Sequence, residues 1–545
     1  MSFFYPKIFS CLKNYNLNKF YKDLTSGIIV AIIALPLSIA LAIASGVTPE
    51  KGLHTAIIAG FIISLLGGSR VQIGGPTGAF MIIVLGIVTQ YGLDGLIIST
   101  IMAGIIMVLM GVFKLGLMIK FIPYPITTGF TSGIALVIFT TQVKDFLGLS
   151  IDNVPGEFLA KWETYFSHIG TISWQSLLIG AISLLIIVFW SKVNKKIPGS
   201  LIALIVATLI VYFLKLDVET IGSKFGEISS ALPIPRIPAI NLQTIKMLLP
   251  PAITIALLGS IESLLSAVVA DGMIGSKHRS NTELIAQGIA NIASGLFGGI
   301  PATGAIARTA ANVKNGGRTP IAGIVHALVL LLIMLVFMPL AKLIPLSCLA
   351  AILMVVAYNM SHWRAFKDLM GAPKSDIFVL LTTFALTVVV DLVVAIEVGM
   401  VMASFLFMKR MSDIASVQNL SMDADEEGEG GEEEIVSDLS GNTIIYNING
   451  PFFFGAVDKF TEIIRSVQEN TKVIILNMTN VPVMDATALH ALSNLYSACK
   501  AYKTRLILID IKKQPYSVLE KSGFLFKLGK KNIFKSLEEA LEKVA

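Results

Sequence analysis

The stretch Gly74-Gly-Pro-Thr-Gly-Ala-Phe80 interrupts an apolar segment with glycines and a proline, and Gly298-Gly-Ile-Pro-Ala-Thr-Gly-Ala-Ile306 repeats it 224 to 226 residues later. A second matching pair, Phe121–Pro123 and Leu343–Pro345, lies at an offset of 222 residues. Two unrelated motifs at nearly one offset indicate that the chain contains an internal duplication.

The composition shows what is duplicated. The 545 residues are 54% hydrophobic and 14% charged, whereas soluble domains are roughly 25% charged. A helix that crosses a membrane needs about 20 mostly apolar residues. Runs of this kind recur up to about Arg410, among them Leu24–Ala44, Leu96–Val112, Ser176–Trp190, Leu201–Leu214 and Ala327–Leu340. We predict a polytopic α-helical membrane protein with fourteen segments. Seven segments per half would insert the second half upside down, as in many secondary transporters.

The position of the basic residues predicts the orientation. Residues 1–22 carry lysines but no cleavable signal pattern, which favours a cytoplasmic N-terminus. The turns that would then face the cytoplasm hold most of the cations: Lys114, Lys120, Lys192, Lys195, Lys196, Lys277, Arg279, Lys314, Arg318, Arg364, Lys367, Lys374, Lys409 and Arg410. This asymmetry follows the positive-inside rule. It predicts both termini on the cytoplasmic side of a bacterial inner membrane, and it gives no indication of nucleic-acid binding.

The chain changes character beyond Arg410. The acidic run Asp423–Glu434 predicts a solvated linker, and an alternation of strands and helices follows it. Strands are predicted at Thr443–Asn449, Val473–Met478 and Arg505–Asp510, and helices at Ala456–Glu469, Ala486–Tyr502, Gln514–Ser522 and the C-terminus. The predicted organisation is a cytoplasmic N-terminus (1–22), a transmembrane transport domain (23–411), a linker (412–440) and an α/β domain (441–545).

The repeated motifs predict an anion site. Each is interpreted as extended backbone followed by a short helix, Thr77–Thr89 or Thr303–Asn312, with Pro76 or Pro301 in the first turn. Such half-helices begin near the membrane midplane, with free N–H groups and a positive dipole end. Irregular backbone at that depth is tolerated where it lines a cavity. Two facing ends would bind an anion, although a pair of proline-kinked helices without a ligand is the simpler alternative.

Charged residues within the segments are few. Glu262 lies in the apolar run Ile253–Val269, and Ser266 follows one turn later on the same helix face. We expect these two residues to hold a coupling proton or sodium ion. Arg308 lies about one turn into the second half-helix, where it would add positive charge behind the anion. The alternative is a structural ion pair between Glu262 and Arg308. The three cysteines, Cys11, Cys348 and Cys499, show no metal-binding spacing, and we expect no metal or other cofactor.

These residues resemble the sulfate permease (SulP) and solute carrier 26 anion transporters. The likeness is carried by Gly74–Phe80, by Gly259–Ala311 with its Asn281-Thr-Glu-Leu-Ile-Ala-Gln-Gly-Ile-Ala-Asn291, and by the C-terminal domain. That domain resembles a STAS domain (sulfate transporter and anti-sigma factor antagonist) through Gly450–Gly455 and Val483–Leu489. The resemblance implies a seven-plus-seven inverted repeat. It further implies a core (segments 1–4 and 8–11) that moves against a gate (5–7 and 12–14), a homodimer and an elevator-like cycle.

The resemblance also implies roles for individual residues. The anion cavity would lie between the starts of segments 3 and 10, and Pro36, Leu37 and Ser38 would form a wall. Glu262 would be linked to the coupling cation, Arg308 to the anion, and Asp485 with Thr487 to regulation, unless these two only cap a helix. The implied anion-binding residues are Thr77, Gly78, Ala79 and Phe80, facing Thr303, Gly304, Ala305 and Ile306.

The leading functional hypothesis is a secondary active transporter of a small anion such as sulfate, bicarbonate or a dicarboxylate, with proton symport. Sodium-coupled bicarbonate symport is the alternative. Sodium-using relatives resemble this stretch but carry aspartate where this chain has Glu262, and the glutamate favours proton coupling. A hypothesis of another class is a STAS-linked membrane sensor, possessing a cytoplasmic partner at that domain. A nucleobase permease is disfavoured, because the half-helix Thr303–Asn312 holds no acidic residue. The sequence contains no P-loop and no nucleophile elbow, so neither motif indicates an enzyme.

Overall fold

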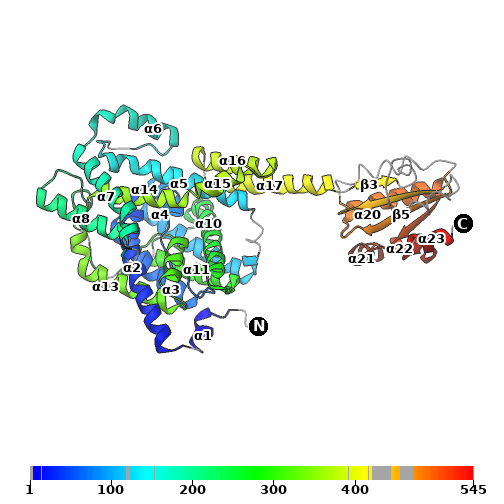
Figure 1. Cartoon of the computed structure of the whole chain (residues 1–545), viewed down its shortest axis with the longest axis horizontal. Coiled ribbons are helices and arrows are strands. Elements are labelled where there is room, and N and C mark those ends of the chain that lie inside the picture. The colour runs from blue at the N-terminus through cyan, green and yellow to red at the C-terminus, as the bar shows by residue number, and fades with distance from the viewer. Residues whose placement is uncertain are drawn as a thin grey trace. The chain divides into compact units, whose positions relative to one another are not determined.

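The computed structural model describes residues 4–543 except 14, 118–122, 152–153, 195–196, 228, 232, 237, 240, 391, 415, 420–442 and 454–470. The chain forms two compact units, Met1–Met400 and Val401–Ala545 (Figure 1). Much of the predicted linker and the predicted helix Ala456–Glu469 lie outside the described residues. Each unit is described in turn.

The first unit is helical apart from two short strands, β1 (Gly74–Gly75) and β2 (Thr303–Gly304). Its helices, with the short η2 (Ile169–Thr171), are α1 (Lys7–Leu12), α2 (Leu17–Ala44), α3 (Pro49–Leu66), α4 (Gly78–Val112), α5 (Tyr124–Leu147), α6 (Phe158–Ser167), α7 (Trp174–Val193), α8 (Gly199–Leu214), α9 (Ile221–Phe225), α10 (Leu242–Ile274), α11 (Ser280–Leu296), α12 (Ile306–Lys314), α13 (Ile321–Ala341), α14 (Leu346–Met360), α15 (Trp363–Leu369), α16 (Lys374–Val389) and α17 (Leu392–Ile414), which continues into the second unit.

Six helical stretches of the described chain are long and apolar enough to cross a membrane: Leu17–Ala44, Gly78–Val112, Tyr124–Leu147, Leu242–Ile274, Ile321–Ala341 and Leu346–Leu369. Trp174–Trp190 and Gly199–Leu214 are shorter apolar helices. The count of fourteen segments stays a prediction. Part of the difference lies in α4, which joins two helical stretches across Gly92, a glycine with a φ of 70°. The structure therefore has a polytopic helical unit followed by a separate α/β unit, as the sequence predicted.

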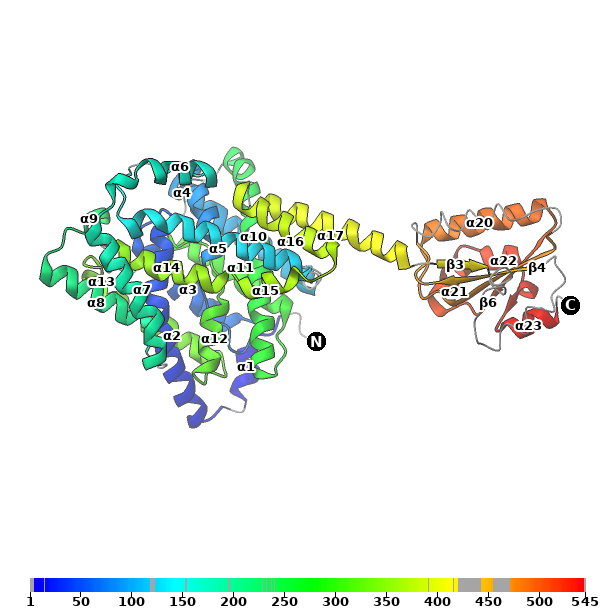
Figure 2. The same cartoon turned by 45° about the horizontal axis from the view of Figure 1, so that its top comes forward.

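The helices of the first unit pack mainly in two sets, which the views in Figures 1 and 2 place beside one another. In one set, α11 packs on α3 and α4, α10 on α4 and α12, and α13 on α2 and α3. In the other, α5 carries α14 and α16, while α7 packs on α8 and α14. The crossing of α4 and α11 uses glycines, since a Cβ on Gly104 would lie 2.6 Å from the carbonyl oxygen of Gly288. Small residues let two helix backbones approach without a side chain between them.

The second unit is a five-stranded sheet in the order β3-β4-β5-β6-β7. β3 (Ser416–Asn419) pairs antiparallel with β4 (Thr443–Asn449), whereas β4, β5 (Val473–Asn480), β6 (Arg505–Ile509) and β7 (Ile533–Phe534) are parallel. Its helices are α20 (Ala486–Ala501), α21 (Lys513–Lys521), α22 (Phe524–Leu528) and α23 (Leu537–Glu542), with a short η5 (Lys530–Asn532). Alternate strand residues feed two apolar clusters, one covered by α20–α22 and the other by α23. The three predicted strands are present, each within two residues of its predicted bounds.

Candidate functional site

The two copies of the repeated motif meet in space. β1 pairs antiparallel with β2, so that Gly74 lies opposite Gly304 and Gly75 lies opposite Thr303. Helix α4 begins at Gly78, within the first copy, and α12 begins at Ile306, the last residue of the second. A two-stranded crossing of extended backbone therefore holds the starts of two helices from the two halves of the chain.

The prolines do not lie where the sequence predicted. The residue before α4 is Thr77 and the residue before α12 is Ala305, so Pro76 precedes the cap and Pro301 precedes β2. The prediction of proline in the first helical turn is wrong for both copies. The second helix also begins at Ile306 rather than Thr303, because Thr303 and Gly304 are used in the strand pair.

Neither helix start is capped by its own side chain. Thr77 and Ala305 both have extended backbone, and neither side chain accepts from a backbone N–H of its helix. The Thr77 hydroxyl instead donates to the Glu262 carboxylate over 3.2 Å. The first N–H groups of α4 and α12 thus lack a side-chain acceptor from their cap residue. Their partial positive charge is the ordinary basis of anion binding at a helix start.

Arg308 ties the second half to the first. Its side chain is 3% exposed, and its Nη2 donates to the carbonyl oxygen of Pro76 over 2.6 Å. Its Nη1 is buried with no partner in the described part of the chain. A Cβ on Gly75, whose φ is 152°, would lie 2.4 Å from that Nη1, so only glycine fits beneath the guanidinium. A buried cation with a free hydrogen-bond donor is suited to bind an anion.

Glu262 and Arg308 do not form the structural ion pair that was the alternative interpretation. No salt bridge joins them within the described residues, and Glu262 is half-buried on α10. The acid is hydrogen-bonded at the start of α4, whereas the base, from α12, is hydrogen-bonded to Pro76. Both charges therefore lie at the crossing as separate groups.

The serines of α10 contact the crossing directly. The Ser263 hydroxyl lies 2.6 Å from the Thr303 hydroxyl and accepts from the Gly304 N–H over 3.2 Å. Ser266, which was expected beside Glu262, donates instead to Thr309 of α12 over 3.3 Å. Ser263 was missed by the sequence reasoning, although it stands next to Glu262 in a run of small hydroxyl residues.

Two buried amides fix the second strand, and both were missed as site residues. Asn291 of α11 accepts from the Ala302 N–H and donates to the Ala302 carbonyl, each over 2.8 Å. Gln72 donates to the Ser263 carbonyl over 3.0 Å. A Cβ on Gly304 would overlap the Gln72 amide at 1.4 Å, which explains the glycine at that position. Asn291 is the last residue of the stretch Asn281–Asn291 that carried the family resemblance. That stretch is the sequence signal from which Asn291 could have been predicted as a site residue.

The apolar candidates pack around the start of α4 and in α2. Ala79 and Phe80 are buried in the first turn of α4, and the Phe80 ring packs on Gly259 of α10. Gly78 approaches Ile138 of α5, since an added Cβ would lie 2.8 Å from the Ile138 Cδ1. Pro36 and Ser38 of α2 are buried and Leu37 is half-buried, and the Ser38 hydroxyl has no partner among the described residues.

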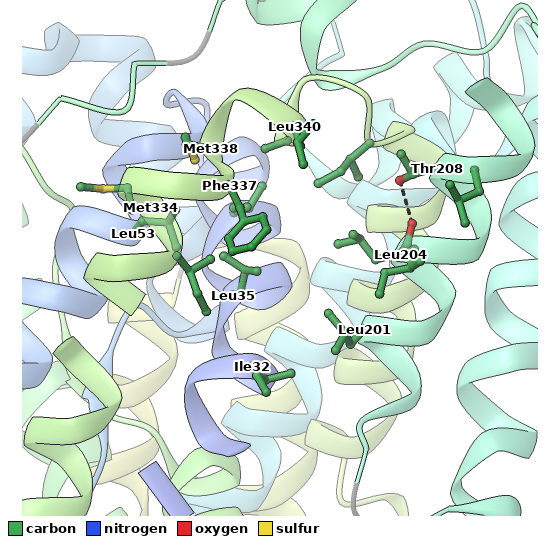
Figure 3. A pocket seen from close by; sticks show the side chains of 16 residues that line it. Ile32, Leu35, Leu53, Leu201, Leu204, Thr208, Met334, Phe337, Met338 and Leu340 are labelled. Carbon is green, nitrogen blue, oxygen red and sulfur yellow. Dashed lines mark hydrogen bonds between the residues drawn. The ribbon is translucent and has the colours of Figure 1, made fainter. Parts of the chain in front are cut away.

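A separate cavity of about 380 Å³ lies between α2, α8 and α13 and is lined almost wholly by apolar side chains (Figure 3). Leu35, Leu204 and Phe337 project into it from these three helices. It has no charged lining group, and neither Glu262 nor Arg308 lines it. Its chemistry suits an acyl chain or a sliding contact, and it is not a candidate anion site.

In the second unit, Asp485 caps α20 by accepting from the Ala488 N–H over 2.8 Å. Thr487 is exposed in the first turn of that helix. The capping interpretation of Asp485 is therefore confirmed. Thr487 is accessible to solvent, which is one requirement for modification.

The fold defines a polytopic helical membrane protein in which helix starts from the two halves of the chain meet at one crossing. The model of the sulfate permease family matches residues 20–383, and that of the STAS domain matches residues 434–540. The chain belongs to the sulfate permease family of anion transporters and carries a C-terminal STAS domain.

Known relatives extend over nearly the whole chain. A Bacillus subtilis protein named "Putative sulfate transporter YvdB" is 45% identical over 97% of this chain and 98% of its own length. The "Bicarbonate transporter BicA" of Picosynechococcus is 31% identical over 95% of this chain and 94% of its own. The murine Solute Carrier 26 family member A9 shares the fold with a TM-score of 0.87, covering 99% of this chain and 93% of that one at 19% identity.

Proposed function

We propose that this chain is a secondary active symporter that carries a small oxyanion or carboxylate together with a proton across a bacterial inner membrane. One observation carries the proposal: the β1–β2 crossing presents two uncapped helix starts and the free donor of Arg308, with a carboxyl group at one of the helix starts. The anion would bind between Thr77–Phe80 and Thr303–Ile306, with Arg308 behind it.

Glu262 supplies a physical basis for coupling. An ionised carboxylate hydrogen-bonded to Thr77 would place a negative charge beside the anion and repel it. Protonation removes that charge, so the anion and the proton favour each other's binding. Reciprocal coupling of this kind is what symport requires. The partners of the transport reaction are therefore an anion and a proton.

The movement we propose is elevator-like. The set of helices that includes α2–α4 and α10–α13 would form the core, and it would move against the gate set that includes α5, α7, α8, α14 and α16. The half-helices belong to the core set, so the site would travel with it. We further propose a homodimer with cytoplasmic termini, in which the STAS domain contacts a cytoplasmic partner and Thr487 accepts a phosphate.

The substrate proposal rests on the chemistry of the site and on the names of relatives. A site built from backbone N–H groups and one guanidinium selects charge and size more than shape, which admits sulfate, bicarbonate and dicarboxylates. The likeness to a bicarbonate transporter keeps sodium-coupled bicarbonate symport as a second candidate. In that case the Glu262 carboxylate and the Thr77 hydroxyl would be oxygen ligands for Na⁺.

The test is uptake of radiolabelled sulfate, bicarbonate and fumarate into proteoliposomes of the full chain under an imposed proton or sodium gradient. We expect one anion to accumulate under the proton gradient alone. Accumulation under the sodium gradient alone would overturn the proton assignment and support the second candidate. Binding of an anion without flux under either gradient would instead support a sensor.

A further inference from the structure

A second cavity, of about 510 Å³, lies between the two sets of helices. α2 and α4 line it from one set and α5 and α14 from the other, and α6 contributes Lys161 and Tyr165. The basic-residue pattern places this region on the external face. Its deeper part approaches the candidate anion site, because Ile82 lines the cavity only one helical turn, about 5.4 Å, beyond Gly78.

The charge of the described lining is positive, with Lys144, Lys161 and Lys224 against Asp145. Two of the lysines are already engaged. Lys144 donates to the carbonyl of Ile151, and Lys224 lies 3.8 Å from the Asp145 carboxylate. Lys161 remains, 5% exposed and with no hydrogen bond or ion pair to any residue that the structure describes.

Tyr165 stands beside this lysine. It follows Lys161 by four residues, so both side chains leave α6 on one face. Its ring is fixed in an apolar cluster with Val143 and Met354, and it is 3% exposed. Its hydroxyl is buried with no partner in the described part of the chain. Lys161 and Tyr165 thus line one cavity, and neither donor is paired with a residue that the structure describes. A bound ligand that accepts hydrogen bonds would satisfy the buried Tyr165 hydroxyl and pair with the lysine.

We propose that Lys161 and Tyr165 form an outer binding site for an oxyanion, which the transporter captures there before it reaches the half-helices. Sulfate or bicarbonate would accept from the Lys161 ammonium and the Tyr165 hydroxyl, and the surplus positive charge would raise the local anion concentration. This inference rests on the proposed function, because it assumes that the captured anion is the transported one.

The protonation of both groups agrees with this assignment. Burial lowers the pKa of Lys161 from its ordinary 10.5. A bound anion would stabilise the ammonium and raise that pKa again. Burial, with a smaller contribution from Asp145, raises the pKa of Tyr165, so its hydroxyl stays a donor at neutral pH.

The test uses the full chain with sulfate as the first probe and bicarbonate as the second. Uptake into right-side-out vesicles is measured against external anion concentration for the wild type, Lys161→Gln, Lys161→Arg and Tyr165→Phe. We expect Lys161→Gln to raise the external KM about tenfold with little change in kcat, and Lys161→Arg to restore most of the affinity. Lys246→Gln, an exposed lysine at the start of α10, removes the same charge and should change nothing.

A second readout does not depend on transport. Acetylation of Lys161 by a water-soluble reagent, followed by mass spectrometry, should slow about threefold or more when sulfate is present, and only in protein that retains Tyr165. If the wild type transports an anion while Lys161→Gln and Tyr165→Phe leave KM unchanged and that anion gives no protection, the outer site is overturned. If the wild type transports none of sulfate, bicarbonate and fumarate under either gradient, the proposed function fails, and protection by sulfate still decides whether the outer site exists.

Discussion

At the scale of single residues, the site depends on one acid and one base that are kept apart. Glu262 is held by Thr77 and Arg308 by the Pro76 carbonyl, with no bridge between them in the described structure. A direct ion pair would neutralise the charges of Glu262 and Arg308, and neither side chain would then be free to bind a proton or an anion. Their separation leaves the base available to an anion and the acid available to a proton.

Glu262→Gln should uncouple the transporter without unfolding it. The amide keeps the size of the side chain and its hydrogen bond to Thr77, but it cannot take up and release a proton. We expect proton-driven accumulation to fall at least about tenfold, while exchange of internal for external anion persists. Both rates are measured in the same proteoliposomes. Accumulation at the wild-type level would remove Glu262 from the coupling mechanism.

Arg308→Lys and Arg308→Ala should both weaken anion binding, by about tenfold or more for alanine. Lysine keeps the charge but loses the fork that donates to Pro76 while leaving Nη1 free. The dissociation constant is measured by equilibrium binding of radiolabelled substrate to purified protein. Lys314→Ala, at the exposed end of the same helix, is the matched control. Unchanged affinity in the alanine variant would assign Arg308 a structural role only.

At the scale of elements, the β1–β2 crossing is the feature on which the site depends. Gly75 has no room for a side chain because the Arg308 guanidinium covers it. We expect Gly75→Ala to abolish transport and lower thermal stability, since the methyl group must displace either the strand or the arginine. Gly272→Ala on α10, where the added carbon meets nothing, should be close to wild type. Transport by Gly75→Ala at the wild-type rate would show that the crossing adapts.

In the second unit, Asp485→Ala should loosen the start of α20. Loss of the cap costs about 1 kcal/mol, roughly a fivefold change in an opening equilibrium. Hydrogen exchange of the Ala488 amide, measured by mass spectrometry on the full chain, should speed up accordingly. Thr487→Ala leaves the cap intact and should not change that rate. Equal exchange in both variants would show that the cap contributes nothing measurable.

The sequence predicted the elements better than their junctions. Apolar runs and duplicated glycines are local signals, and they located the helices and the two motifs that meet at the crossing. Which residue of Thr303–Ile306 extends as strand and which starts the helix depends on a partner strand 228 to 230 residues away. The Arg308–Pro76 contact likewise spans 232 residues. Likewise, no local pattern distinguishes Ser263 from Ser266 as the serine that contacts β2.

At the scale of the whole transport unit, the apolar cavity between α2, α8 and α13 marks where the two sets of helices are loosely joined (Figure 3). If the core slides against the gate, side chains at this boundary must pass one another. Leu204→Trp would fill the cavity, and we expect it to lower kcat about tenfold while KM stays unchanged. Leu185→Trp on α7 adds the same bulk at an exposed position and is the control. An unaffected kcat for Leu204→Trp would contradict a sliding boundary here.

The β1–β2 crossing also limits when this region of the protein can fold during its synthesis. β1 cannot pair until β2 has been made, and the contacting residues Pro76 and Arg308 are 232 positions apart. At a synthesis rate of about 5 to 20 residues per second, the first strand waits roughly 10 to 50 s for its partner. During that interval the Gly74–Gly75 backbone is without its ladder hydrogen bonds in or near the bilayer, where unsatisfied polar groups are costly. The first half of the chain can therefore complete this part of its fold only after the second half has been synthesised.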